Sequence, residues 1–231
     1  MYNNVILILS LFITYMTVLI IFKLFQEQGL FMWTIIATIA ANIEALMVIQ
    51  AFGMEMTLGN ILFASTFLVT DIASETYGKK TAQKTVILGI ATSIIFILIS
   101  QSWMLYQPSE TDWVTPSIRK IFSTTPRMML ASLSVYAFVQ MFDVWLYHLW
   151  WDFTLKKFDD KKSFLWLRNN GSTLLSQLLN SVLFTWAAFW NIYETKTLFS
   201  IAISSYIIFI ITSLADTPFI YVARKIFDKT L

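Results

Sequence analysis

Long apolar segments are the feature of this sequence that most restricts its fold. Seven segments of roughly 20 residues recur along the 231-residue chain, and a helix needs about 20 apolar residues to cross a bilayer. A helix satisfies its backbone polar groups internally, and the alternation typical of β-barrel strands is absent. The sequence therefore predicts an all-α integral membrane protein, a bundle of about seven transmembrane helices. The segments are Val5–Phe25, Leu30–Gln50, Thr57–Tyr77, Thr85–Trp103, Pro126–Trp150, Ser172–Asn191 and Leu198–Val222.

Composition excludes several other classes of protein. Charged residues make up 13% of the chain, against about 25% in an ordinary soluble domain, and the net charge of +2 does not suit a nucleic-acid-binding protein. With no Cys and a single His, His148, thiol chemistry and a His-rich metal site are both excluded. Hydrolase, metalloprotease and P-loop motifs are also absent. We therefore expect neither an enzyme nor a bound cofactor or metal.

Basic residues are distributed unevenly between the two sides of the predicted bundle. If the seven segments alternate in direction, 12 of the 16 Lys and Arg residues fall on one side. Lys and Arg concentrate in cytoplasmic loops, so we expect the N-terminus outside and the C-terminus in the cytoplasm. The first segment lacks the basic start and the cleavage site of a signal peptide, and we expect it to remain as a span. The four residues on the other side are Arg119, Lys120, Arg127 and Lys196.

Two connections between segments carry patterns of their own. The outer loop Tyr106–Thr125 contains a short amphipathic piece, Ser117–Phe122, which predicts a helix at the membrane interface. The inner loop Trp151–Asn169 mixes aromatic residues with lysines that include Lys161 and Lys162. That mixture is typical of a segment anchored at the membrane surface.

Polar side chains recur inside the predicted spans, where charged groups are costly and are usually functional. Several are paired three or four residues apart and therefore share one helix face. No basic residue lies near the centre of a span, so these carboxylates favour a donor-rich or cationic solute. Hydrogen bonding between helices is the alternative for the amides, and an ion pair with Lys79 is the alternative for Glu75. The candidate substrate-binding residues are Asn42, Asp71, Glu75, Gln140, Asp143, Gln177, Asn180 and Asp216.

Several stretches resemble the signature of the queuosine-precursor transporter family (VUT family). They are FLVTDIASETYGKK at residues 67–80, QMFDVW at 140–145, LRNNGSTLLSQ at 167–177, and the shorter ANI at 41–43 and DTPFIY at 216–221. The resemblance implies a six-span transporter core over residues 29–231, preceded here by one extra span over residues 1–28. It also implies import of 7-deazaguanine bases for tRNA modification across the bacterial inner (plasma) membrane. Such bases include the cyano- and aminomethyl-deazaguanines and queuine.

A 7-deazaguanine suits the candidate residues chemically. A carboxylate accepts both the N1–H and the 2-amino group, an amide donates to the carbonyl oxygen, and an aromatic ring stacks on the flat face. We expect Asp71, Glu75, Gln140, Asp143, Gln177 and Asn180 to converge on one cavity near the membrane interior, with Asp216 close by.

Two positions depart from the family pattern. Asn180 stands where the family often has Asp, and Phe209 stands where it commonly has an intramembrane Lys. Loss of an acid and a Lys together would preserve neutrality if the two normally pair. The alternative function is a substrate-binding membrane subunit of a multicomponent ATP-driven vitamin or nucleobase importer. The small-molecule base and the lipid bilayer are the expected partners, and a homo-oligomer is compatible with either function.

Overall fold

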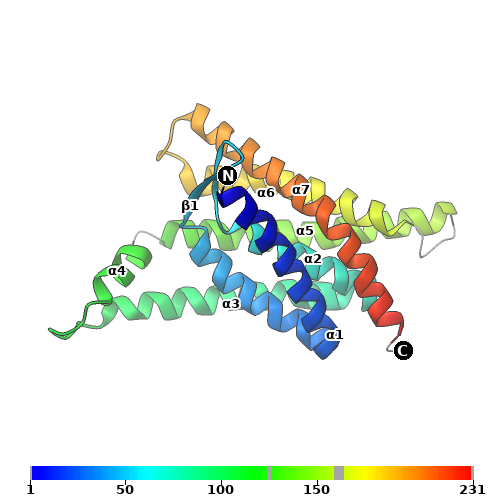
Figure 1. Cartoon of the computed structure of the whole chain (residues 1–231), viewed down its shortest axis with the longest axis horizontal. Coiled ribbons are helices and arrows are strands. Elements are labelled where there is room, and N and C mark those ends of the chain that lie inside the picture. Colours follow the sequence, from blue (N-terminus) through cyan, green and yellow to red (C-terminus); the bar gives the residue numbers. More distant parts are fainter. Residues whose placement is uncertain (1, 124–125, 159–163, 230–231) are drawn as a thin grey trace.

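Helices make up most of the computed structural model, which describes residues 2–123, 126–158 and 164–229 (Figure 1). The predicted all-α architecture is confirmed, with one short β-hairpin added to it. In chain order the elements are α1 (Tyr2–Glu44), β1 (Val48–Ala51), β2 (Met54–Thr57), α2 (Asn60–Thr76), α3 (Lys79–Ser102), the 3-10 turn η1 (Trp103–Leu105), α4 (Thr115–Ser123), α5 (Pro126–Phe158), α6 (Leu165–Phe189) and α7 (Thr195–Asp228).

The first two predicted segments form the two arms of α1. The helix breaks at Gln26, where φ is 51° and ψ is −132°, and the second arm runs back beside the first (Figure 1). A Cβ atom on Gly29 would lie 2.5 Å from the carbonyl oxygen of Ile21. Glycine at this position therefore permits the close approach of the two arms, and the break falls between the predicted segments Val5–Phe25 and Leu30–Gln50.

The end of the second predicted segment is wrong. Its helix stops at Glu44, and the residues that follow form an antiparallel hairpin in which Val48 pairs with Thr57. Phe52 and Gly53 occupy the turn with φ values of 52° and 75°, the left-handed values that a two-residue hairpin needs. Apolar content alone does not separate a helix end from a short strand.

The hairpin lies against the N-terminus of the chain. The Asn3 side chain donates to the Gln50 carbonyl oxygen at 2.9 Å, and the Phe52 N–H donates to Asn4 Oδ1 at 2.9 Å. We call this the hairpin end of the bundle, and the opposite end, where α7 finishes, the C-terminal end (Figure 1).

Helix α2 lies at the centre of the bundle. Thirteen of its 17 residues are buried, and it packs against α1, α3, α5 and α7. The surrounding core includes Phe22, Leu68, Val144, Leu165 and Ile220. Polar side chains of α2 therefore face other helices rather than lipid.

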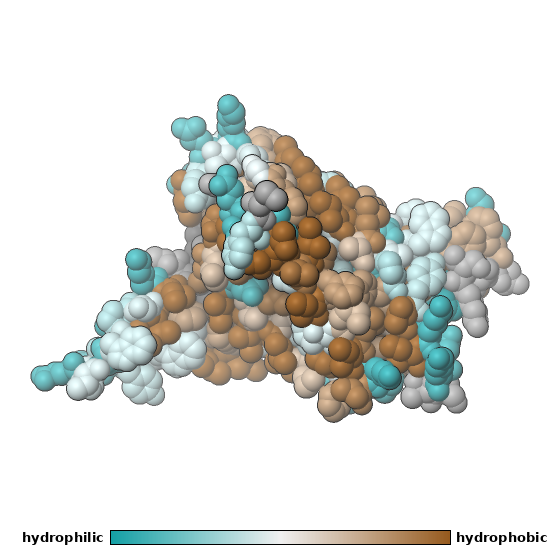
Figure 2. All heavy atoms as spheres, viewed as in Figure 1, coloured by the Kyte–Doolittle hydropathy of each residue, from teal (hydrophilic) through white to brown (hydrophobic). Residues whose placement is uncertain are grey.

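Four helices of the described chain are long and apolar enough to cross a membrane. They span Tyr2–Glu44, Lys79–Leu105, Leu130–Phe158 and Thr195–Asp228. Apolar residues cover the middle of the molecule in the view of Figure 2, while hydrophilic ones gather toward its extremities. The protein is thus a multi-pass helical membrane protein. The count of seven spans stays a prediction, because α2 is short and α6 is rich in Asn, Ser and Gln.

The two predicted connections have different outcomes. A helix is present where the sequence predicted one, as α4, while its location at the membrane interface stays a prediction. The inner loop predicted over Trp151–Asn169 is largely wrong, because α5 continues to Phe158 and α6 begins at Leu165. Lys161 and Lys162 lie outside the described residues.

Candidate functional site

A cavity opens at the hairpin end of the bundle. Its volume is about 160 Å³, and about 10–15 Å³ of such volume holds one water molecule, so a small bicyclic solute fits. Val48 and Tyr193, which are exposed, lie at its mouth, whereas Thr66, Asn180 and Phe209, which are buried, lie deeper. The second arm of α1, the hairpin and helices α2, α3, α5, α6 and α7 all contribute to its wall.

Three asparagines supply amide groups to this cavity. The Asn42 amide donates to the Thr38 carbonyl oxygen at 2.8 Å, which leaves its own oxygen as an acceptor. Asn60 Oδ1 accepts from the Thr57 hydroxyl at 3.0 Å, and its Nδ2 has no partner among the described residues. Asn180 forms no side-chain hydrogen bond within the described chain. The wall thus presents both unpaired donors and unpaired acceptors.

Aromatic rings form another part of the wall. Phe63 lies 6.0 Å from Phe209 and 6.1 Å from Tyr136 between ring centroids. Gly89 on α3 makes room for Tyr136, since a Cβ atom there would fall 2.0 Å from the tyrosine oxygen. Asn180 and Phe209, the two departures from the family pattern, both line this cavity.

Gln140 lies behind the cavity wall. Its Nε2 donates to the Thr66 hydroxyl at 2.7 Å, and its Oε1 accepts from the Thr70 hydroxyl at 3.3 Å. Both ends of the amide are therefore engaged by α2, as the helix-bridging alternative predicts.

Three buried carboxylates form a second level, which we call the carboxylate layer: Asp71 on α2, Asp143 on α5 and Asp216 on α7. All three are at most 1% exposed. The Thr173 hydroxyl donates to Asp71 Oδ2 at 3.1 Å, and Asn169 Nδ2 donates to Asp216 Oδ1 at 2.8 Å. Neither oxygen of Asp143 receives a hydrogen bond from a described residue.

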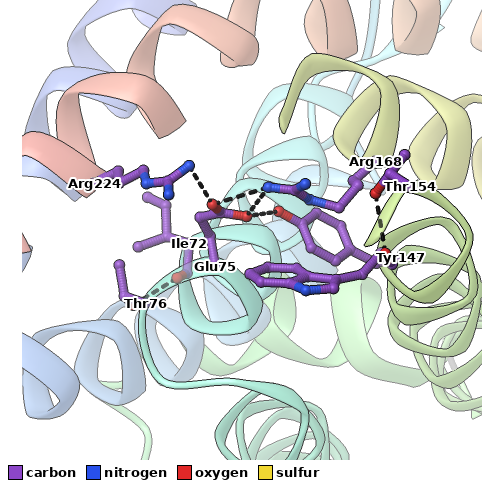
Figure 3. Close-up of polar contacts among 8 residues, drawn as sticks. Ile72, Glu75, Thr76, Tyr147, Thr154, Arg168 and Arg224 are labelled. Atoms are coloured by element: carbon purple, nitrogen blue, oxygen red, sulfur yellow. Dashed lines mark hydrogen bonds and ion pairs between the residues drawn. The ribbon is translucent and has the colours of Figure 1, made fainter. Parts of the chain in front are cut away.

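Glu75 belongs to a third level, nearer the C-terminal end, which we call the Glu75 network (Figure 3). Its carboxylate lies 3.0 Å from Arg168 and 2.8 Å from Arg224, and it accepts a 2.7 Å hydrogen bond from Tyr147. The Arg168 guanidinium also lies 4.2 Å from the ring centroid of Trp151. Glu75 is therefore an ion-pair residue, with arginines in place of the Lys79 that the sequence suggested.

The expectation that no basic residue enters the central bundle is wrong. Arg168 is fully buried, although its sequence motif had been assigned to a surface loop. Helical spacing is the signal that could have placed it inside, since Arg168 precedes the buried Ser172 and Ser176 by one and two helical turns.

The candidate residues thus lie at three levels rather than around one cavity. Asn42 and Asn180 line the cavity, Gln140 supports its wall, and Glu75 belongs to the ion-pair network. The remaining candidates are buried between these levels: Asp71, Asp143, Gln177 and Asp216. Sequence reasoning missed Asn60, Phe63, Tyr136, Tyr147, Arg168 and Arg224.

Comparisons with known proteins agree on one family. A family model described as "Putative vitamin uptake transporter" matches residues 57–223. The "Probable queuosine precursor transporter" of Bacillus subtilis (strain 168) is 35% identical over 225 residues, which cover 97% of this chain and 96% of that protein. No solved structure matches the chain.

Proposed function

Because the chain belongs to the vitamin uptake transporter (VUT) family, we propose that it imports queuosine precursors across the bacterial inner membrane. The substrates are 7-deazaguanine bases, namely cyano- and aminomethyl-deazaguanines or queuine. The name of the Bacillus subtilis relative, a probable queuosine precursor transporter, supports this substrate class. The product of the transport step is the unmodified base in the cytoplasm, where it is available for tRNA modification.

We further propose seven spans with the N-terminus outside. The two arms of α1 each cross once, and α2 crosses in the interior of the bundle, sheltered from lipid by its neighbours. Helix α6 crosses beside α5 and α7 and turns part of its apolar surface outward. The hairpin end then faces outward. The C-terminal end, which carries Lys79, Lys80, Lys156, Lys157 and Lys225, faces the cytoplasm as basic residues favour.

The cavity at the hairpin end is the observation that carries the proposal. Its chemistry matches a flat base with donors on one edge and a carbonyl oxygen on another. The Asn42 oxygen is available to accept from N1–H or the 2-amino group, and the unpaired Asn60 Nδ2 is available to donate to the carbonyl oxygen. Phe63 and Phe209 offer ring faces for stacking.

The Glu75 network suits a barrier on the cytoplasmic side. It ties α2 to α6 and α7 through two ion pairs, while the cavity opens at the other end of the bundle. In this state a base enters from outside and goes no further. Import then requires α6 and α7 to move relative to α2, so that the ion pairs of Glu75 separate and a path opens inward.

Uptake of a radiolabelled base tests the proposal. The host is a strain that neither makes nor imports queuosine precursors, and the label is 7-cyano-7-deazaguanine. We expect the labelled base to accumulate in cells that express the wild-type chain. With Asn180→Ala the accumulation at low base concentration should fall by roughly two- to ten-fold, the effect of one lost neutral hydrogen bond. Gln107→Ala, on the exposed loop before α4, is the matched control.

Reconstitution separates this function from its alternative. The purified chain alone in liposomes should admit the base without ATP. If entry requires added ATPase subunits, the chain is a substrate-binding subunit of an ATP-driven importer. If the chain reaches the membrane and no base enters under either condition, the substrate assignment is wrong.

A further inference from the structure

We propose that the carboxylate layer is a proton site, and that Asp143 carries one proton inward with each imported base. The inference rests on the proposed import function. It assigns the energy source of transport to the proton gradient and separates the role of the layer from that of the cavity.

The first support is an imbalance of charge. Asp71, Asp143 and Asp216 are buried on three different helices, and none of them forms an ion pair with a described residue. The two arginines closest to this region, Arg168 and Arg224, both contact Glu75. Uncompensated charge in a protein interior costs several kcal/mol per ion. Binding of a cation to the layer removes part of that cost.

The second support is that unpaired acceptors surround the layer. Both Asp143 oxygens and Asp71 Oδ1 have no hydrogen-bond partner among the described residues. Outside the carboxylates, the buried amide oxygens of Asn169 and Gln177 are also unpaired. Ser172 and Ser176 on α6 lie next to Asp143. The Ser172 hydroxyl donates to the Asn169 carbonyl oxygen instead, and Ser176 Oγ has no partner within hydrogen-bond distance among the described residues. Such a set of acceptors selects a ligand that is positively charged or donates hydrogen bonds.

Geometry favours a proton over a metal ion. Within the described parts of the chain, no group of three or more His, Asp or Glu side chains is placed to hold a metal ion. A proton needs only one carboxylate oxygen at a time, so it does not require the three acids to converge. Asp143 is the acid with the fewest hydrogen bonds of the three, and it is fully buried.

Other titratable groups face this region from the neighbouring helices. Besides Asp71 and Asp216, they are Glu75 on α2 and Arg168 on α6, which are paired with each other, and Tyr147 on α5, whose hydroxyl is bound to Glu75. Tyr15 on α1 also faces Asp216 and Asp71, and its hydroxyl donates to the Thr212 carbonyl oxygen. On α3 the charged residues lie at its beginning, where Lys79 faces His148. None of these contacts supplies a counter-charge to Asp143.

A short chain of contacts links the cavity to Asp143. Thr66 lines the cavity and bonds to Gln140, which lies one turn before Asp143 on α5. A base that contacts Thr66 therefore acts on the same helix face that holds the proton. In the transport step an Asp143 oxygen gains a proton on the outer side, forming one O–H bond. It loses the same proton to water after the Glu75 network opens.

Proteoliposomes containing the purified full chain and an entrapped pH dye test the coupling. External 7-cyano-7-deazaguanine is used because the base itself is uncharged. We expect the interior to acidify when the base is added, and an inward proton gradient to raise base uptake. In Asp143→Asn the ratio of uptake with and without the gradient should fall to one, whereas Asp143→Glu keeps a ratio above one. Asp152→Asn, an exposed aspartate on the same helix, should match the wild type.

The outcomes separate the two proposals. Base entry without acidification in the wild type overturns proton coupling and leaves the import function standing, as does a gradient effect that persists in Asp143→Asn. Absence of any base entry contradicts the import function. In that case the infrared carbonyl band of a protonated carboxyl group, measured on the purified protein, still shows whether the carboxylate layer holds a proton. The band should be present in the wild type and reduced in Asp143→Asn, and an unchanged band refutes the proton site.

Discussion

Arg168 on α6 lies 3.0 Å from Glu75 on α2, and both side chains are hidden from solvent. Burying two charges costs desolvation energy that a single contact barely offsets, so such a pair depends on further partners. Glu75 has them in Arg224 and Tyr147, and Arg168 stacks on Trp151. The arrangement joins four helices, α2, α5, α6 and α7, at the end of the bundle opposite the cavity.

Removal of either partner of this pair should destabilise the protein strongly. In Glu75→Gln the two arginines lose their carboxylate, and in Arg168→Gln the acid loses its buried cation. We expect each change to lower the free energy of unfolding by about 3–5 kcal/mol. Thermal unfolding of the purified protein in detergent measures the loss.

The double variant separates the pair interaction from general damage. Glu75→Gln combined with Arg168→Gln should cost less than the sum of the two single changes, by about 0.5–3 kcal/mol. Arg224→Gln is the comparison, and its effect should be smaller because the Arg224 side chain is 17% exposed. Strictly additive losses would show that the two residues do not stabilise each other.

The two departures from the family pattern should behave as a pair. Phe209→Lys places an ammonium group at a position only 3% exposed, and we expect a loss of about 3 kcal/mol in stability. Addition of Asn180→Asp, on the wall of the same cavity, should restore part of that loss. Melting temperatures of the single and double variants measure it. Equal instability of Phe209→Lys with and without Asn180→Asp would refute the pairing.

The orientation in the membrane can be tested directly because the chain contains no Cys. Glu110→Cys, on the loop before α4, should react with an impermeant thiol reagent in intact cells. Asp228→Cys, at the end of α7, should react only after permeabilisation. Both positions are exposed, so access to the reagent depends on the side of the membrane. The reverse pattern of labelling would overturn the proposed orientation.

Gly89→Ala should disturb the cavity wall. The added methyl group would overlap Tyr136, whose hydroxyl oxygen lies 2.0 Å and whose ring carbon Cζ lies 2.7 Å from the position of the new Cβ. Overpacking of this kind costs about 1–3 kcal/mol, and uptake of the base should fall as Tyr136 is displaced. Tyr136→Leu in the Gly89→Ala background should recover stability. Ile87→Ala, on the exposed face of the same helix, serves as the control. A Gly89→Ala protein with unchanged melting temperature would contradict the close contact.

The helical, membrane-spanning character of the chain could be predicted from its sequence, because segment length and apolar content are local properties. The break between the two arms of α1 and the presence of a helix at α4 were predictable for the same reason, since the ends of apolar segments and amphipathic spacing are set by a few neighbouring residues. The hairpin was not, because Val48–Thr57 is apolar enough to continue a helix and only its contacts with the N-terminus distinguish it.

The sequence by itself determined which polar residues lie in the interior. Six of the eight candidates are buried, and the other two, Asn42 and Glu75, are partly buried when backbone and side chain are counted together. Tertiary structure alone decided which of them meet. Glu75 and Arg168 are 93 residues apart in the chain, and no local pattern states that one neutralises the other. A buried charge is stabilised by whatever group the packing of distant helices brings within a few ångströms. The partners of Glu75, and the lack of any for Asp143 within the described parts of the chain, therefore follow from the packing of α2, α5, α6 and α7.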